Sequence, residues 1–159
     1  PTNLYGPGDD FDLETSHVLP ALLRKVHEAK EAAPDGSDAP VTLWGSGEPK
    51  REFLYVEDLA EAVRFVLERP ENEIREVAPD GMLNVGGGKD LSINDLMSRI
   101  QEVVGHDGPV EHDRSKPDGT PRKLVDTTRM ETLGWTAQTS LREGLQKTYD
   151  WYREHEALT

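Results

Sequence analysis

The sequence predicts a small α/β or α+β domain in which helices alternate with short, separated strands. Apolar residues recur at helical spacing in several segments, and the runs with strand character are only a few residues long. Such strands are too few and too widely spaced to form a complete doubly wound sheet. The 159 residues give room for one ordinary domain, which we place at residues 1–159.

In the first part of the chain, turn formers separate the apolar segments. Pro20 is tolerated only in the first turn of a helix, so the helix that follows Ser16 is expected to begin near His17. Trp44 alternates away from Val41 and Leu43 and therefore points to the opposite face of its strand. The expected elements are a strand at 1–5, a helix from 17 to about 33, a loop at 34–40, and strands at 41–44 and 51–56.

In the second part, the clearest signal is at Ser92, because Asp95 stands at the third helical position of a capping box. Gly105 is expected to end that helix. A helix at 57–69 is expected to face the core with Leu59, Ala60, Val63, Val66 and Leu67. The remaining expected elements are a charged linker to residue 80, strands at 82–85 and 109–112, and helices at 128–133 and from 140 onward.

The acidic composition excludes several classes of partner. Lys and Arg number 18 against 31 Asp and Glu, which gives a net charge of −13, and this field repels nucleic acids and anionic membranes. No apolar run is long enough to span a membrane, and no secretory leader is recognisable. The absence of cysteine fits a cytoplasmic protein. We expect no metal site.

Two glycine-rich nucleotide motifs are excluded. Three glycines precede Lys89, but Leu83 stands where a phosphate loop needs its first glycine, and Asp90 replaces the required hydroxyl. No Gly-x-Gly-x-x-Gly opens a helix in this chain. A nicotinamide cofactor, if used, would therefore be held mostly by other residues.

The segment from Ser115 to Lys123 is the strongest candidate for an anion site. Pro117 and Pro121 stiffen it into an ordered loop, and its cations repel one another unless acids or a bound anion neutralise them. Both explanations stay open at this point. For three other candidates the residues alone favour a structural role. Arg51 fits a surface ion pair, Trp44 fits core packing, and His17 fits a place at a helix start.

Groups of residues together resemble the carboxyl half of the extended short-chain dehydrogenases/reductases. The stretch Pro1 to Pro7, with Trp44 to Gly47 and Arg51 to Leu54, carries this resemblance. The segments 16–23 and 115–123 resemble the GDP-L-fucose synthases within that family. Such enzymes epimerise C3 and C5 of a GDP-4-keto-6-deoxymannose and then reduce its C4 ketone with NADPH.

The resemblance implies roles for particular residues. His17 would be the general acid of the epimerisation and would lie beside the cofactor. The other residues at the nicotinamide end of NADPH would be Pro1, Thr2, Asn3 and Leu4. The residues that contact the GDP-sugar would be Lys25, Trp44, Arg51 and Lys123. Members of the family can have Arg at the position of Lys25. A lysine there offers a point charge in place of the bidentate contact that an arginine can make.

The resemblance also implies that this chain is the C-terminal substrate-binding domain, and that the cofactor-binding Rossmann domain is not in it. No tyrosine here has a lysine four residues later, so the reductase pair would belong to the other half. We therefore expect the chain alone to be inactive and monomeric, and the intact enzyme to be a homodimer. The alternatives are a fragment of another nucleotide-sugar epimerase or dehydratase, and a non-catalytic binding module.

Overall fold

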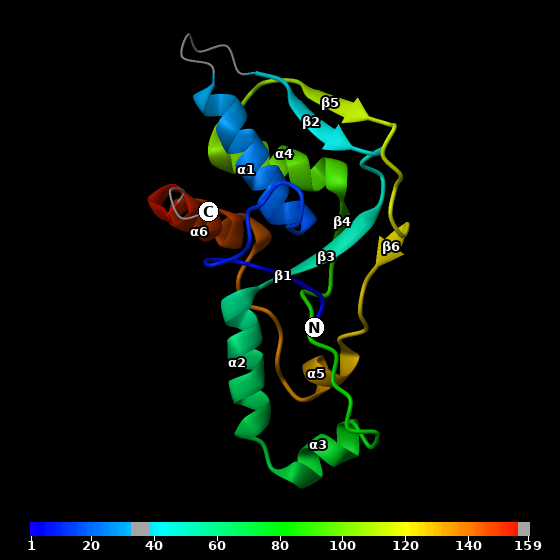
Figure 1. The fold of residues 1–159 in the computed structure, drawn as a ribbon. Helices are drawn as coiled ribbons and strands as arrows, with labels where there is room; N and C mark the ends of the chain where they lie inside the picture. Colours follow the sequence, from blue (N-terminus) through cyan, green and yellow to red (C-terminus); the bar gives the residue numbers. More distant parts are fainter. Residues whose placement is uncertain (33–38, 156–159) are drawn as a thin grey trace.

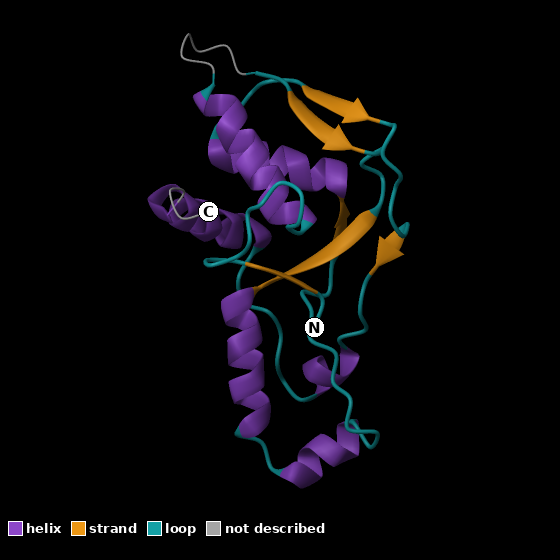
Figure 2. Ribbon diagram, viewed as in Figure 1, coloured by secondary structure: helices purple, strands orange, loops and turns teal. Residues whose placement is uncertain are grey.

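The computed structural model describes residues 1–32 and 39–155 and shows a mixed α/β fold (Figures 1 and 2). The helices are α1 (Val18–Glu31), α2 (Val56–Leu67), α3 (Glu71–Val77), α4 (Ile93–Val104), α5 (Thr128–Thr132) and α6 (Leu141–His155). The strands are β1 (Asn3–Tyr5), β2 (Val41–Trp44), β3 (Lys50–Tyr55), β4 (Asp90–Ser92), β5 (Val110–Asp113) and β6 (Arg122–Lys123). The expected end of the first helix and most of the expected loop at 34–40 lie outside the described residues.

Strand β3 is the centre of the larger sheet. Its second half pairs with β1 in parallel, with Asn3 opposite Phe53. Its first half lies between β4, which is antiparallel, and β6, which is parallel. In that register the Cα of Arg51 is the partner of Lys123 on one side and of Leu91 on the other. Segments from three distant parts of the sequence therefore meet at Arg51.

A second, two-stranded sheet joins β2 and β5 in parallel, with Val41 opposite Val110. It lies beside α1 and α4 in the upper part of the molecule (Figure 1). Val41 and Leu43 are buried while Trp44 is half exposed, as their alternation predicted. The strand thus delivers Trp44 to the surface beside the turn at 45–49.

The main core lies among α1, α4 and α6, which pack against one another beside β2 and β3 (Figure 2). Its fully buried side chains come from all three helices and include Leu23, Val26, Leu96, Ile100 and Leu145. The helical spacing of these residues predicted this packing. Ser92 and Asp95 form the expected capping box of α4, and Gly105 ends the helix in the left-handed conformation.

A smaller cluster around Leu54, Ala62, Met130 and Trp135 holds α2 and α5 together. The prediction for the buried face of α2 held for Leu59 and Val66, which pack against this cluster, and was wrong for Ala60, Val63 and Leu67. Val63 is 51% exposed and Leu67 is 80% exposed, whereas the buried residues of the helix are Asp58 and Ala62. The apolar stripe is therefore covered only in part.

Two further local predictions were also wrong. The charged segment after Pro70 forms α3, because acids in the first turn and the Glu71–Arg75 ion pair favour a helix. No strand forms at 82–85. There, the Thr2 N–H donates to the Val85 carbonyl and the Asn84 amide donates to the Asp126 carbonyl. These isolated hydrogen bonds take the place of regular strand pairing.

Two buried carboxylates hold loops in place. Glu52, on β3, accepts hydrogen bonds from the backbone N–H of Gly88 and Val125 at 2.7 and 3.1 Å. Asp58, on α2, accepts from the backbone N–H groups of Gln138 and Thr139 and from the Thr139 hydroxyl. Across the described ranges, no helix is long and apolar enough to cross a membrane.

Candidate functional site

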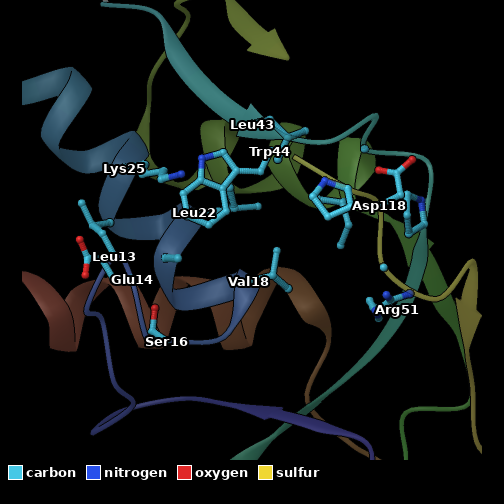
Figure 3. Close-up of a pocket in the computed structure, with 16 residues that line it drawn as sticks. Leu13, Glu14, Ser16, Val18, Leu22, Lys25, Leu43, Trp44, Arg51 and Asp118 are labelled. Atoms are coloured by element: carbon cyan, nitrogen blue, oxygen red, sulfur yellow. The ribbon is translucent and has the colours of Figure 1, made fainter. Parts of the chain in front are cut away.

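A cavity of about 280 Å³ opens between the start of α1, the end of β2 and the loop that precedes β6. Its lining includes Ser16, Lys25, Trp44 and Arg51, which lie around one space in Figure 3. Leu22, Leu43 and Ile93 form part of its apolar wall. We call this space cavity 1. It brings together three residues that the resemblance assigned to the substrate.

Two ammonium groups lie near the ring of Trp44, which lines cavity 1. The Lys25 Nζ is 4.5 Å from the Trp44 ring centroid, and the Lys116 Nζ is 5.1 Å from it. Lys25 also donates to the Thr42 carbonyl at 3.4 Å. Burial lowers the pKa of Lys25, because it disfavours the charged form. A ring that is 50% exposed and flanked by cations offers a flat surface to a planar, electron-rich ligand.

Arg51 links β3 to the loop that carries the basic residues. Its Nη1 donates to the Lys50 carbonyl at 2.7 Å and to the Thr120 carbonyl at 2.6 Å. Gly119 lies against the guanidinium, since a Cβ added there would be 2.9 Å from Nη2. Two carbonyl groups thus engage the Arg51 Nη1, and the remaining N–H donors of the guanidinium are available to a ligand.

Asp118 ties the same loop to the turn after β2. Its carboxylate accepts from the Ser46 backbone N–H at 2.8 Å and from the Ser46 hydroxyl at 2.7 Å. These two bonds are the main reason that the pKa of Asp118 is lowered. Gly45, at φ +78°, allows this approach, because a side chain there would collide with the Asp118 carboxylate.

The charges around cavity 1 are mixed. Lys25 and Arg51 line it, and so do two carboxylates, Glu14 and Asp118. Asp118 is engaged by Ser46, and Lys116 adds a third cation beside the Trp44 ring. Figure 3 shows Arg51 and Asp118 at one side and Lys25 and Glu14 at the other. The free donors of Arg51 therefore lie apart from the lysine–tryptophan end.

A second cavity, of about 400 Å³, lies along β1 and the turn that follows it. We call it cavity 2. Thr2, Asn3, Leu4 and His17 line it together. Ser16 and Val18 line cavity 1, so the start of α1 lies between the two spaces. His17 is the N-cap residue of α1, but its side chain makes no capping hydrogen bond.

The structure therefore places most predicted site residues in two neighbouring cavities. Pro1 and Lys123 line neither. Lys123 lies on β6, with an exposed side chain and its Cα opposite that of Arg51. Arg122 of the same segment pairs with Asp90. The basic loop contributes Pro117, Asp118 and Gly119 to the wall of cavity 1, rather than its cations.

Sequence reasoning missed two contributions to the site. They are Asp118, in the loop from Ser115 to Lys123, and Asp9, in the turn region after the first expected strand. Asp9 lines cavity 2 beside His17. An aspartate within a proline- and glycine-rich stretch is an ordinary turn signal, so only its position in the fold reveals the cavity. In residues 1–32 and 39–155, no group of three or more His, Asp or Glu side chains could hold a metal ion.

The sequence and the fold match one class of protein, the NAD dependent epimerases/dehydratases. Residues 1–86 match the model of the NAD dependent epimerase/dehydratase family. This match covers more than half of the chain, and the chain belongs to that family.

Its relatives narrow the family further. The chain is 50% identical over 152 residues to GDP-L-fucose synthase 1 of Arabidopsis thaliana, covering 96% of this chain and 44% of the relative. It is 49% identical over 159 residues to the GDP-L-fucose synthase of Escherichia coli K12, covering 98% of this chain and 48% of that relative. A GDP-L-fucose synthetase from Naegleria fowleri, solved with NADP bound, superposes with a TM-score of 0.83 at 27% identity over 99% of this chain and 46% of that one. The chain thus spans about half the length of these relatives.

Proposed function

We propose that this chain is the substrate-binding domain of a GDP-L-fucose synthase. The observation that carries the proposal is the convergence of Lys25, Trp44 and Arg51 on cavity 1, next to a second cavity that contains His17. The names of its relatives support the same activity. The intact enzyme would convert GDP-4-keto-6-deoxymannose to GDP-L-fucose, and the cofactor domain would lie in the remainder of the polypeptide.

Arg51 and Lys25 bind the diphosphate in this proposal. A guanidinium binds phosphate oxygens in a bidentate manner, and an ammonium adds a point charge. Arg51 retains donors that no described residue engages, while its Nη1 is held by carbonyl groups. Lys123 is the third proposed contact. Its exposed position on β6 lets its flexible side chain turn toward a bound anion.

Trp44 supports the nucleoside in the same proposal. Its half-exposed ring stacks on a base or packs against the ribose, and the two nearby lysines favour an anionic ligand. Trp44 and Arg51 line opposite parts of cavity 1 (Figure 3). This separation suits a ligand with a ring at one end and phosphates at the other.

His17 is the proposed general acid of the epimerisation. Abstraction of the C3 or C5 proton leaves a carbanion that the C4 ketone stabilises as an enolate. The imidazolium N–H then gives its proton to the opposite face of that carbon, so a C–H bond forms and the ring is left neutral. An exposed ring on the lining of a cavity can reach a ligand there.

Cavity 2 fits one end of a nicotinamide cofactor. Its volume of about 400 Å³ lies in the usual ~300–1,000 Å³ range of small-molecule pockets. Thr2, Asn3 and Leu4 offer mostly backbone and small polar groups to it. The cofactor supplies hydride for reduction of the C4 ketone when it is bound. We propose NADPH for this role, a homodimer for the intact enzyme, and the cytoplasm as its compartment.

Titration calorimetry of the chain with GDP and UDP tests the nucleotide class. We expect the chain to bind GDP more tightly than UDP. We expect Arg51→Ala to abolish this binding. A preference for UDP would favour another nucleotide-sugar epimerase, and no binding of either would contradict the role of cavity 1. The chain alone is also expected to be inactive. Turnover of the keto sugar with NADPH by the purified chain would show that it holds a complete active site.

A further inference from the structure

One carboxylate oxygen in cavity 2 is buried without a hydrogen-bond donor. The Asp9 Oδ1 accepts the backbone N–H of Asp10 at 2.9 Å. The Asp9 Oδ2 has no partner, and it is the one buried side-chain nitrogen or oxygen atom without a partner in the described parts of the chain. Buried polar atoms in native proteins are nearly always satisfied, so this oxygen requires an explanation.

The lack of a donor has an energetic consequence. Burial raises the pKa of Asp9, although the Asp10 N–H and the nearby His17 both act to lower it. The ionised carboxylate is therefore less stable in the folded protein than it would be in water. A carboxylate kept under such a cost is typical of functional sites rather than of simple turns.

His17 is positioned to supply the missing donor. It lines the same cavity as Asp9 and interacts with it electrostatically. The His17 carbonyl is occupied by the N–H of Ala21, whereas its ring makes no capping bond. The imidazole can therefore rotate about its side-chain bonds while the backbone stays in place. A rotation that brings one ring N–H to the Asp9 Oδ2 would satisfy both groups.

We propose that Asp9 is a positioning residue for His17. Its free oxygen accepts one imidazole N–H, so that the other ring nitrogen faces the cavity, and its negative charge favours the protonated ring. The reaction it serves rests on the function proposed above. The paired geometry is the one by which carboxylates commonly orient histidines in active sites.

The other ionisable groups around Asp9 do not provide an alternative partner. Asp10 lies next to it and carries the same charge, which raises rather than lowers the pKa of Asp9. Tyr5 also lines the cavity, but its hydroxyl lies against Gly144 in the core. From α2, cavity 2 is lined by Val56, which has no polar side-chain atom. Among the described residues that line cavity 2, His17 is the one with a basic side chain.

The test compares Asp9→Asn with Asp10→Asn in the enzyme produced from the complete reading frame. Asp10→Asn is the matched control, because it removes the same charge from the neighbouring position. The Asp10 side chain is exposed. We expect Asp9→Asn to lower kcat for GDP-4-keto-6-deoxymannose about tenfold or more, with KM within twofold. The alkaline limb of the kcat profile should move to lower pH, since the charge that favours the protonated ring is lost. Asp10→Asn should change neither.

A second measurement separates this pairing from the proposed reaction. The ¹⁵N shifts of the His17 ring, assigned with His17→Gln, report which nitrogen carries the proton. We expect one fixed tautomer at alkaline pH in the parent protein and a mixture in Asp9→Asn. A parent enzyme without epimerase activity would overturn the proposed function alone, and the ring shifts would then decide the pairing. Equal kcat profiles and equal ring shifts in the parent and Asp9→Asn would overturn the proposal.

Discussion

The Arg51 Nη1 donates to the Thr120 carbonyl at 2.6 Å, which joins two residues that are 69 positions apart in the chain. The same bond connects the centre of the larger sheet to the loop that walls cavity 1. Because Gly119 lies against the guanidinium, the loop and the arginine determine each other's position. The anion-binding capacity of this region therefore depends on the loop conformation as much as on the cations in it.

Replacement of Arg51 by lysine is expected to weaken GDP binding by about 1.5–3 kcal/mol. Lysine keeps the charge but loses the planar fork that serves the loop carbonyl and the phosphate together. Titration calorimetry measures the change. Arg64→Lys is the matched control, because Arg64 is an exposed arginine on α2 that pairs with Glu61 and Glu68. Equal affinities of Arg51→Lys and the parent chain would show that the fork makes no contact with GDP.

Lys123→Ala tests the one predicted cation that does not line cavity 1. We expect a loss of GDP affinity of about 1.5–3 kcal/mol if its side chain turns toward the diphosphate. Lys89→Ala, at an exposed lysine far along the chain, serves as the control for the change in net charge. Calorimetry at two salt concentrations measures both variants. An affinity that Lys123→Ala leaves unchanged would restrict the role of the basic loop to shaping the wall of cavity 1.

Asp118→Asn is expected to destabilise the loop and to do so in a pH-dependent way. The Ser46 hydrogen bonds lower the pKa of Asp118 below its ordinary value of 3.8. A lowered carboxyl pKa stabilises the folded state above the ordinary value, and the contribution is lost as pH falls through the lowered pKa. Melting temperatures of the parent and the variant should thus differ at neutral pH and converge below about pH 4. A difference that is the same at pH 3 and pH 7 would contradict this.

Glu52→Ala is expected to lower the free energy of unfolding by about 1–3 kcal/mol. The substitution leaves the backbone N–H groups of Gly88 and Val125 without the buried carboxylate that accepts them. Urea unfolding followed by circular dichroism measures the loss. Glu57→Ala, at an exposed glutamate that starts α2, should change stability much less. Similar losses in both variants would show that the Glu52 contacts contribute little.

The local elements could be predicted because their signals lie within a few residues of one another. The Ser92–Asp95 capping box, the helix stop at Gly105 and the alternation around Trp44 were all confirmed. Predictions failed where the partner of a segment was distant or absent. Val63 and Leu67 on α2 are exposed although they belong to the apolar stripe. The segment at 82–85 bonds to Thr2 and Asp126 instead of forming a strand.

For the site, the resemblance selected residues, and the fold brings most of them together. Lys25, Trp44 and Arg51 share cavity 1, and His17 shares cavity 2 with β1, which no local pattern could have shown. Their roles in binding and catalysis stay predictions. The sequence analysis missed Asp9 and Asp118, because a turn-forming aspartate has the same local signature whether its carboxylate faces water, a serine or a cavity.

The sequence by itself determined the order of the main elements, the ends of several helices and the family, because propensities, caps and motifs act over short stretches. The tertiary structure alone decided which loops meet. Arg51 reaches Thr120, Ser46 reaches Asp118, and Asp9 lies beside His17 only after the sheet and helices have formed. Hydrogen bonds and electrostatic contacts depend on atomic positions in space, which short-range sequence patterns do not specify.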